Sequence, residues 1–126
     1  MQHVVIDDER TFWTDEEVVY LRTADEAILW FAKFFIKMNY RPHFGGAEDQ
    51  ITIWFDHDLG PHSADAVVVA KFLETCGDDW IAPYIAGIKV HSQNPVGAEN
   101  IVRQLKWFAE NICGIVVERV PLPALK

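Results

Sequence analysis

Five short runs of the chain are rich in valine and isoleucine and apolar at most positions. Successive side chains of a strand point to opposite faces, so a run that is apolar throughout predicts a strand covered on both faces, as in parallel sheets. The five predicted strands cover residues 3–7, 17–22, 51–56, 85–90 and 115–118.

Three stretches between or after these strands have apolar residues at helical spacing. The first follows Thr23-Ala24-Asp25-Glu26, a capping box in which the threonine and the glutamate satisfy each other's backbone N–H groups. The third has Asn94 as its predicted N-cap and Pro95 at its first position, where a missing N–H costs nothing. The three predicted helices begin near Thr23, Ser63 and Asn94 and end near Met38, Gly77 and Ile112.

The alternation of strands and helices predicts one α/β domain over residues 1–126, built on a doubly wound, mainly parallel, five-stranded sheet. Only residues 8–16 separate the first two strands, which is too short for a helical crossover, so we expect an irregular loop in place of the first helix. No helical pattern follows the last strand either. One sheet face would then lack its helices and expose Val5 and Trp54. We expect Phe12, Trp13 and residues 121–126 to cover part of that face and a homodimer to bury the rest.

The composition narrows the classes of partner. The chain has 126 residues, 50% of them hydrophobic, and 11 basic against 19 acidic residues give it a formal charge of -8. Such a charge repels phosphate backbones and argues against a broad nucleic-acid surface, while a small phosphorylated ligand or an RNA end held locally is compatible with it. No apolar run approaches the ~20 residues of a membrane span, so we expect a cytoplasmic protein without membrane contact. Cys76 and Cys113 match no metal or redox spacing and are predicted core thiols.

Polar side chains follow three of the predicted strands. The chain reads Asp7-Asp8 after the first strand, Asp56-His57-Asp58 after the third and His91-Ser92 after the fourth. In an open parallel sheet the functional crevice lies at the carboxyl ends of the strands, so these side chains are expected to converge. Carboxylates held together there bind a hard cation or raise one another's pKa. Asp7, Asp8, Asp56 and Asp58 are therefore candidate ligands for Mg²⁺ or Mn²⁺, against the alternative that each aspartate only forms a turn or a cap.

His57 and His91 are the candidate catalytic pair, with Asp56 beside them. Two imidazoles on adjacent strand ends can supply a general base and a general acid, or contact phosphate oxygens; the alternative is that each histidine only satisfies a buried hydrogen bond. The following helix start offers free N–H groups to an anion. Ser92, Asn94, Asn100 and Arg10 are the candidate phosphate-binding side chains.

These strand ends resemble the receiver fold of two-component signalling. The chain has an acidic pair after strand one, an acceptor-like Asp56 after strand three and the hydroxyl of Ser92 after strand four. It departs from that pattern where Arg119-Val120-Pro121 stands in place of a Lys-Pro pair, where His57 follows the acceptor-like aspartate, and where the first and last helices are lacking.

The chain is more similar to the cyclic-phosphate processing receiver-like family, a bacterial and phage group. Four motifs carry this resemblance, in the family's order: Asp7-Asp8-Glu9-Arg10, Thr23-Ala24-Asp25-Glu26-Ala27, Asp56-His57-Asp58-Leu59-Gly60, and His91-Ser92-Gln93-Asn94-Pro95-Val96-Gly97 with Asn100. The resemblance implies a receiver-like (flavodoxin-like) fold. It also implies action on cyclic phosphates, such as the 2′,3′-cyclic phosphate of RNA ends or small nucleotides, in RNA repair or conflict.

Three functions are compatible with this pattern. The leading one is a cyclic phosphodiesterase-type hydrolase. The second is a non-catalytic receiver-like module that binds a phosphorylated ligand or partner. The third is a phosphorylatable receiver, which the absence of the receiver lysine makes the least favoured of the three.

Overall fold

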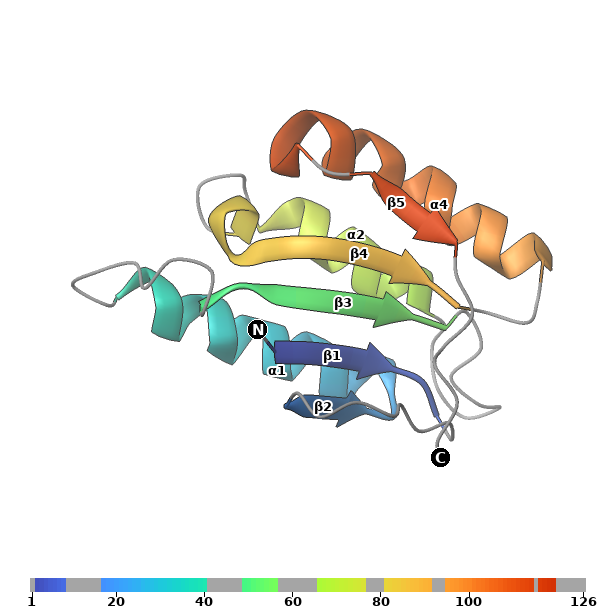
Figure 1. Cartoon of the computed structure of the whole chain (residues 1–126). Coiled ribbons are helices and arrows are strands. Elements are labelled where there is room, and N and C mark those ends of the chain that lie inside the picture. Colours follow the sequence, from blue (N-terminus) through green and yellow to red (C-terminus); the bar gives the residue numbers. More distant parts are fainter. Residues whose placement is uncertain are drawn as a thin grey trace.

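The computed structural model describes residues 2–8, 17–40, 49–56, 66–76, 81–91, 95–114 and 116–119 of the chain. Within these ranges five strands form one parallel sheet in the order β2-β1-β3-β4-β5 (Figure 1). The strands are β1 (Gln2–Ile6), β2 (Val18–Leu21), β3 (Ile51–Phe55), β4 (Ile85–Val90) and β5 (Val117–Arg119). This is the strand order of flavodoxin-like domains, so the predicted α/β fold with its mainly parallel sheet is confirmed.

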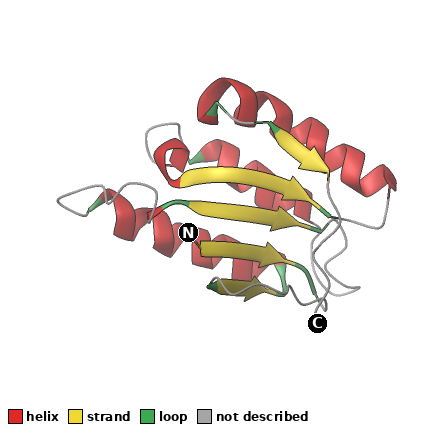
Figure 2. Cartoon of the chain, in the orientation of Figure 1, coloured by secondary structure: helices red, strands yellow, loops and turns green. Residues whose placement is uncertain are grey.

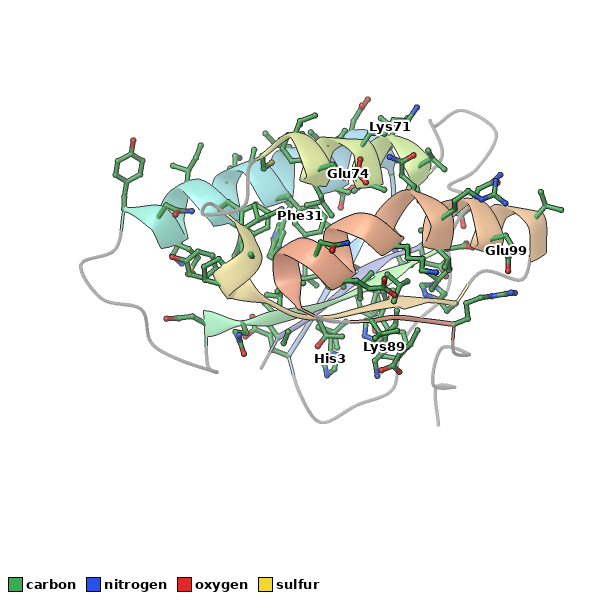
Figure 3. The ribbon with its side chains drawn as sticks, turned by 90° about the horizontal axis from the view of Figure 1, so that it is seen from above. His3, Phe31, Lys71, Glu74, Lys89 and Glu99 are labelled. Carbon is green, nitrogen blue, oxygen red and sulfur yellow. The ribbon has the colours of Figure 1, made fainter. Side chains whose placement is uncertain are left out.

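The α-helices of the described residues form one layer on one face of the sheet (Figure 2). Figure 3 shows them above the strands, with Phe31 on the helix side and with His3 and Lys89 on the opposite side. The helices are α1 (Ala24–Asn39), α2 (Ala66–Thr75) and α4 (Pro95–Phe108); η2 (Ala82–Tyr84) precedes β4, and a π-helical segment, η3 (Ala109–Cys113), continues α4. None of the helices in the described part of the chain has the length and hydropathy to cross a bilayer.

The predicted start of α1 is confirmed in atomic detail. Thr23 has extended backbone angles, and its side-chain oxygen accepts a hydrogen bond from the backbone N–H of Glu26 at 3.1 Å. Asp25 and Glu26 in the first turn place negative charge at the positive end of the helix dipole. The helix then buries Ala27, Phe31 and Phe35 against the sheet, which is the apolar stripe that the sequence predicts.

The element boundaries follow the predictions with small differences. Residues 85–90 form a strand as predicted, whereas the last strand begins later than expected, at Val117. Val117 is the first residue of this strand that pairs with β4, opposite Ile88, and the apolar Val116 before it is 67% exposed. The segments expected to replace the first and last helices, 9–16 and 120–126, lie outside the described residues, as do Phe12 and Trp13.

The main core lies between the sheet and the helix layer. Its largest fully buried side chains include Phe31, Phe55, Ile6, Ile53, Ile88 and Leu105. On the opposite face, Val5 is 0% and Trp54 4% exposed, and Val18 and Tyr20 pack against them. These two side chains are therefore already buried within one chain, and their burial does not require the second copy expected from the sequence.

Candidate functional site

Three candidate site residues directly follow three neighbouring strands. Asp7 follows β1, Asp56 follows β3 and His91 follows β4, and each is still hydrogen-bonded to the adjacent strand through its backbone. The Asp56 N–H donates to the Ile6 carbonyl and the His91 N–H to the Phe55 carbonyl, both at 2.9 Å. The three residues thus lie at the carboxyl end of the sheet, and these backbone hydrogen bonds restrict the positions of their side chains.

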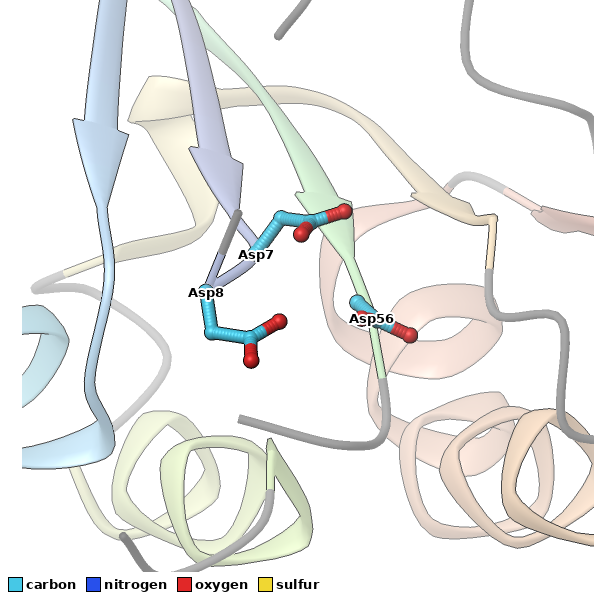
Figure 4. Close-up of side chains that lie close together, drawn as sticks. All are labelled: Asp7, Asp8 and Asp56. Carbon is cyan, nitrogen blue, oxygen red and sulfur yellow. The ribbon is translucent and has the colours of Figure 1, made fainter. Parts of the chain in front are cut away.

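The carboxylates of Asp7, Asp8 and Asp56 form the acidic cluster. One oxygen from each lies within 4.8 Å of the others (Figure 4). Asp7 is 0% and Asp56 5% exposed, whereas Asp8 is accessible to solvent. The predicted convergence of the first and third strand ends is therefore present in the structure.

The acidic cluster is suited to a hard divalent cation. Negative charges at this separation repel one another, and burial of two of them weakens the screening by water. Mg²⁺ binds oxygen ligands at 2.0–2.1 Å, so two oxygens on opposite sides of one ion lie about 4.2 Å apart. The three oxygens of the acidic cluster all lie within 4.8 Å of one another, only slightly more than that separation, and oxygen donors are those that Mg²⁺ and Mn²⁺ prefer. Asp7, Asp8 and Asp56 therefore fit a divalent cation.

His91 is paired with the acidic cluster through Asp7. Its Nε2 lies 3.0 Å from Asp7 Oδ2, and both side chains are 0% exposed. Strand β3 lies between β1 and β4, so this contact spans two strand spacings, about 9.5 Å between strand axes. The imidazole must reach over the end of β3 to make it. The other ring nitrogen, Nδ1, is buried and has no hydrogen-bond partner among the described residues.

Arg22 is a further residue of the site that was not among the residues predicted from the sequence. This residue directly follows β2, at the same edge of the sheet, and its guanidinium donates a hydrogen bond to the Asp7 carbonyl at 3.1 Å. The guanidinium also lies over the Tyr20 ring, 4.7 Å from its centroid. A positive charge so close to Asp7 partly offsets the charge of the acidic cluster. The signal that could have identified Arg22 is its place at a strand end.

The remaining predicted site residues are distributed as follows. Asn100 is exposed on α4, a helix that begins at the strand-end edge of the sheet (Figure 1). The other candidates lie outside the described residues, so their predicted roles stay predictions: His57, Asp58, Ser92, Asn94 and Arg10.

A separate hollow of about 460 Å³ lies near the opposite edge of the sheet. Gln2 is the first residue of β1, and Glu17 directly precedes β2. Both therefore lie at the amino ends of these strands, opposite the carboxyl edge that carries the acidic cluster. The hollow has no cluster of carboxylates or histidines within the described part of the chain, and we place the candidate site at the acidic cluster. The residues that line the hollow are Gln2, Glu17, Trp30, Lys33, Phe34, Lys37 and Met38.

Comparison with known proteins gives one family. Residues 2–107 match the model of the cyclic-phosphate processing receiver domain. The match covers β1 through almost all of α4 and so includes every residue of the acidic cluster and His91. No curated protein and no solved structure matched the chain.

Proposed function

Because the chain belongs to the cyclic-phosphate processing receiver domain family, we propose that it is an enzyme that opens or hydrolyses a cyclic phosphate. The proposed substrate is a 2′,3′-cyclic phosphate, carried by an RNA end or a small nucleotide, and RNA repair is a setting in which such ends arise. A small or terminal phosphate suits a chain with a formal charge of -8, which disfavours a long nucleic-acid backbone.

The observation that carries the proposal is the acidic cluster at the carboxyl edge of the sheet. Asp7, Asp8 and Asp56 bring three carboxylate oxygens within 4.8 Å of one another at the place where open parallel sheets bind their ligands. A divalent cation held there would neutralise phosphate charge and polarise a water molecule. The same carboxylates without a cation would repel a phosphate.

The proposed reaction is the addition of water to the cyclic diester. A water oxygen bonds to phosphorus and gives up one proton, one ring P–O bond breaks, and the departing oxygen takes up one proton to become a hydroxyl. His57 is the proposed side chain that exchanges a proton with the reactants. The sequence pattern also predicts such a role for His91. Ser92, Asn94, Asn100 and Arg10 are proposed to contact the phosphate, together with the N–H groups at the start of α4.

Incubation of the purified chain with 2′,3′-cyclic nucleotides and Mg²⁺ or Mn²⁺ tests the proposal. Phosphorus NMR should show a cyclic diester converted to a monoester, and Asp56→Asn should abolish the conversion. Ligand binding by the wild type without any conversion, in both cations, would support the alternative of a non-catalytic module that binds a phosphorylated ligand. Labelling of Asp56 by acetyl phosphate would instead support a phosphorylatable receiver.

A further inference from the structure

We infer that His91 is a positioning residue, which fixes the Asp7 carboxylate for cation binding and does not itself exchange protons with the substrate. The inference rests on the proposed cation site in the acidic cluster. It assigns His91 a role different from the acid–base role that the sequence pattern suggests.

Neither ring nitrogen of His91 is available to a substrate. A carboxylate can only accept, so Nε2 carries the proton in its 3.0 Å contact with Asp7 Oδ2. Nδ1 is buried and lacks a hydrogen-bond partner in the described structure. One nitrogen is therefore engaged and the other is covered, and the side chain is 0% exposed. A histidine that exchanges protons with a substrate needs a nitrogen within hydrogen-bond reach of it.

His91 is itself held in place by its neighbours. Its backbone N–H donates to the Phe55 carbonyl at 2.9 Å, and its ring lies 6.3 Å from the Trp54 ring, centroid to centroid. Trp54 is fixed in turn: its indole N–H donates to His3 Nδ1 at 3.2 Å, and the Lys89 ammonium lies 4.9 Å from the indole centroid. Packing on the sheet face thus sets the orientation of the imidazole.

The hydrogen bond from His91 also fixes the Asp7 carboxylate. A hydrogen bond to Oδ2 restricts rotation of the carboxylate and defines how its oxygens face Asp8 and Asp56. Residues that orient metal ligands in this way change metal affinity 10- to 100-fold when they are replaced. Without His91, Asp7 would have to be ordered by the cation alone.

The test compares two substitutions of His91 by calorimetric titration with Mn²⁺. His91→Gln can place a side-chain N–H near the position of Nε2, whereas His91→Leu fills similar space without a donor. We expect His91→Leu to weaken Mn²⁺ binding about 10- to 100-fold and His91→Gln to stay within about threefold of the wild type. Tyr84→Phe is the control, because it removes another buried side-chain hydrogen bond, from the Tyr84 hydroxyl to the Met38 carbonyl at 3.3 Å, at the opposite end of β4 from His91. It should leave Mn²⁺ affinity unchanged.

The possible outcomes distinguish a failure of this inference from a failure of the proposed function. Wild-type affinity in His91→Leu overturns the positioning role and leaves the cation site intact. If His91→Leu does not fold, the decision falls to His91→Gln: near-wild-type affinity supports the inference, and a tenfold loss despite a folded chain overturns it.

If the wild type itself binds no Mn²⁺, the proposed cation site is wrong and this role of His91 is overturned with it. The contact can then be examined alone by nitrogen NMR of the imidazole. A hydrogen-bonded Nε2 proton that is lost in Asp7→Ala, which removes the acceptor, would show that only the pairing exists.

Discussion

Asp8 differs from its two neighbours in the acidic cluster because water reaches it. No hydrogen bond or ion pair of the Asp8 side chain is found among the described residues, so its replacement removes charge without removing a known partner. We expect Asp8→Asn to raise the stability of the metal-free chain by up to ~1 kcal/mol, since it relieves repulsion that water partly screens. The same substitution should weaken Mn²⁺ binding about tenfold, because it removes a charged ligand.

Melting curves and Mn²⁺ titration of the same variant measure the two effects. Glu110→Gln is the control, an exposed carboxylate on η3 that is replaced by its amide outside the acidic cluster. It should change neither quantity. A variant Asp8→Asn that binds Mn²⁺ as tightly as the wild type would show that Asp8 is not a ligand.

Cys76 is predicted from its surroundings to be a slow nucleophile. Burial raises the pKa of its thiol, and the thiol donates a hydrogen bond to the Phe72 carbonyl at 3.3 Å. The thiolate is the reactive form, so at pH 8 we expect iodoacetamide to label Cys76 more slowly in the folded chain than in urea. Peptide mass spectrometry separates Cys76 from Cys113. Equal rates in both conditions would contradict the prediction.

The same pKa shift has a defined effect on stability. Because the folded pKa of Cys76 lies above the unfolded one, the unfolded chain loses this proton first as the pH rises. The contribution of the neutral thiol is therefore complete below the unfolded pKa and is lost as the pH rises through the folded pKa. Cys76→Ser should flatten this alkaline decrease.

The start of α1 is stabilised by one side-chain hydrogen bond. Thr23→Ala removes the acceptor for the Glu26 N–H and should lower the free energy of unfolding by about 1 kcal/mol in urea titration. Thr23→Ser keeps a hydroxyl at the N-cap and should recover most of this loss. Mn²⁺ affinity should not change in either variant, because the cap belongs to α1 and makes no contact with the acidic cluster among the described residues. A loss as large in Thr23→Ser as in Thr23→Ala would show that the cap is not the cause.

The strands, the α1 cap and the acidic cluster could be predicted because each depends on residues close in sequence or on a general property of parallel sheets. Short apolar runs rich in valine and isoleucine locate β3 and β4, and the carboxyl-end rule brings Asp7 and Asp56 together. The contact between His91 and Asp7 could not be predicted in the same way. It joins β4 to β1 across β3, and it depends on the exact strand order and on the rotamer of one imidazole.

Two further features depend on packing that composition does not show. The π-helical continuation of α4 through η3 has no periodicity signal distinct from that of an α-helix, so the sequence predicts one uninterrupted helix to Ile112. The sequence places Arg22 at a strand end, but its hydrogen bond to the Asp7 carbonyl depends on the pairing of β2 with β1 and on the conformation of the arginine side chain.

The homodimer expected from the sequence stays a prediction. In the structure, the apolar surface that could form its interface differs from the one predicted. Val5 and Trp54 are buried within one chain. Large apolar side chains of the described residues are exposed instead on the helix layer, where Leu29 is 56% and Ile36 52% exposed. Analytical ultracentrifugation at tens of micromolar measures the oligomeric state directly.

A cation in the acidic cluster should stabilise the whole chain, because its ligands follow β1 and β3, two neighbouring strands in the interior of the sheet. An ion that binds only the folded state at tenfold above its Kd adds about 1.4 kcal/mol, since the gain is RT ln(1 + [L]/Kd). For a domain of this size that gain corresponds to a rise in Tm of about 5 °C.

NaCl at equal ionic strength screens repulsion without bridging the carboxylates and should raise Tm by less than half as much. Asp8→Asn should lose most of the Mg²⁺ effect and keep the NaCl effect. Equal shifts with the two salts in the wild type would mean that the carboxylates are only screened, and the cation would then have no site of its own in this fold.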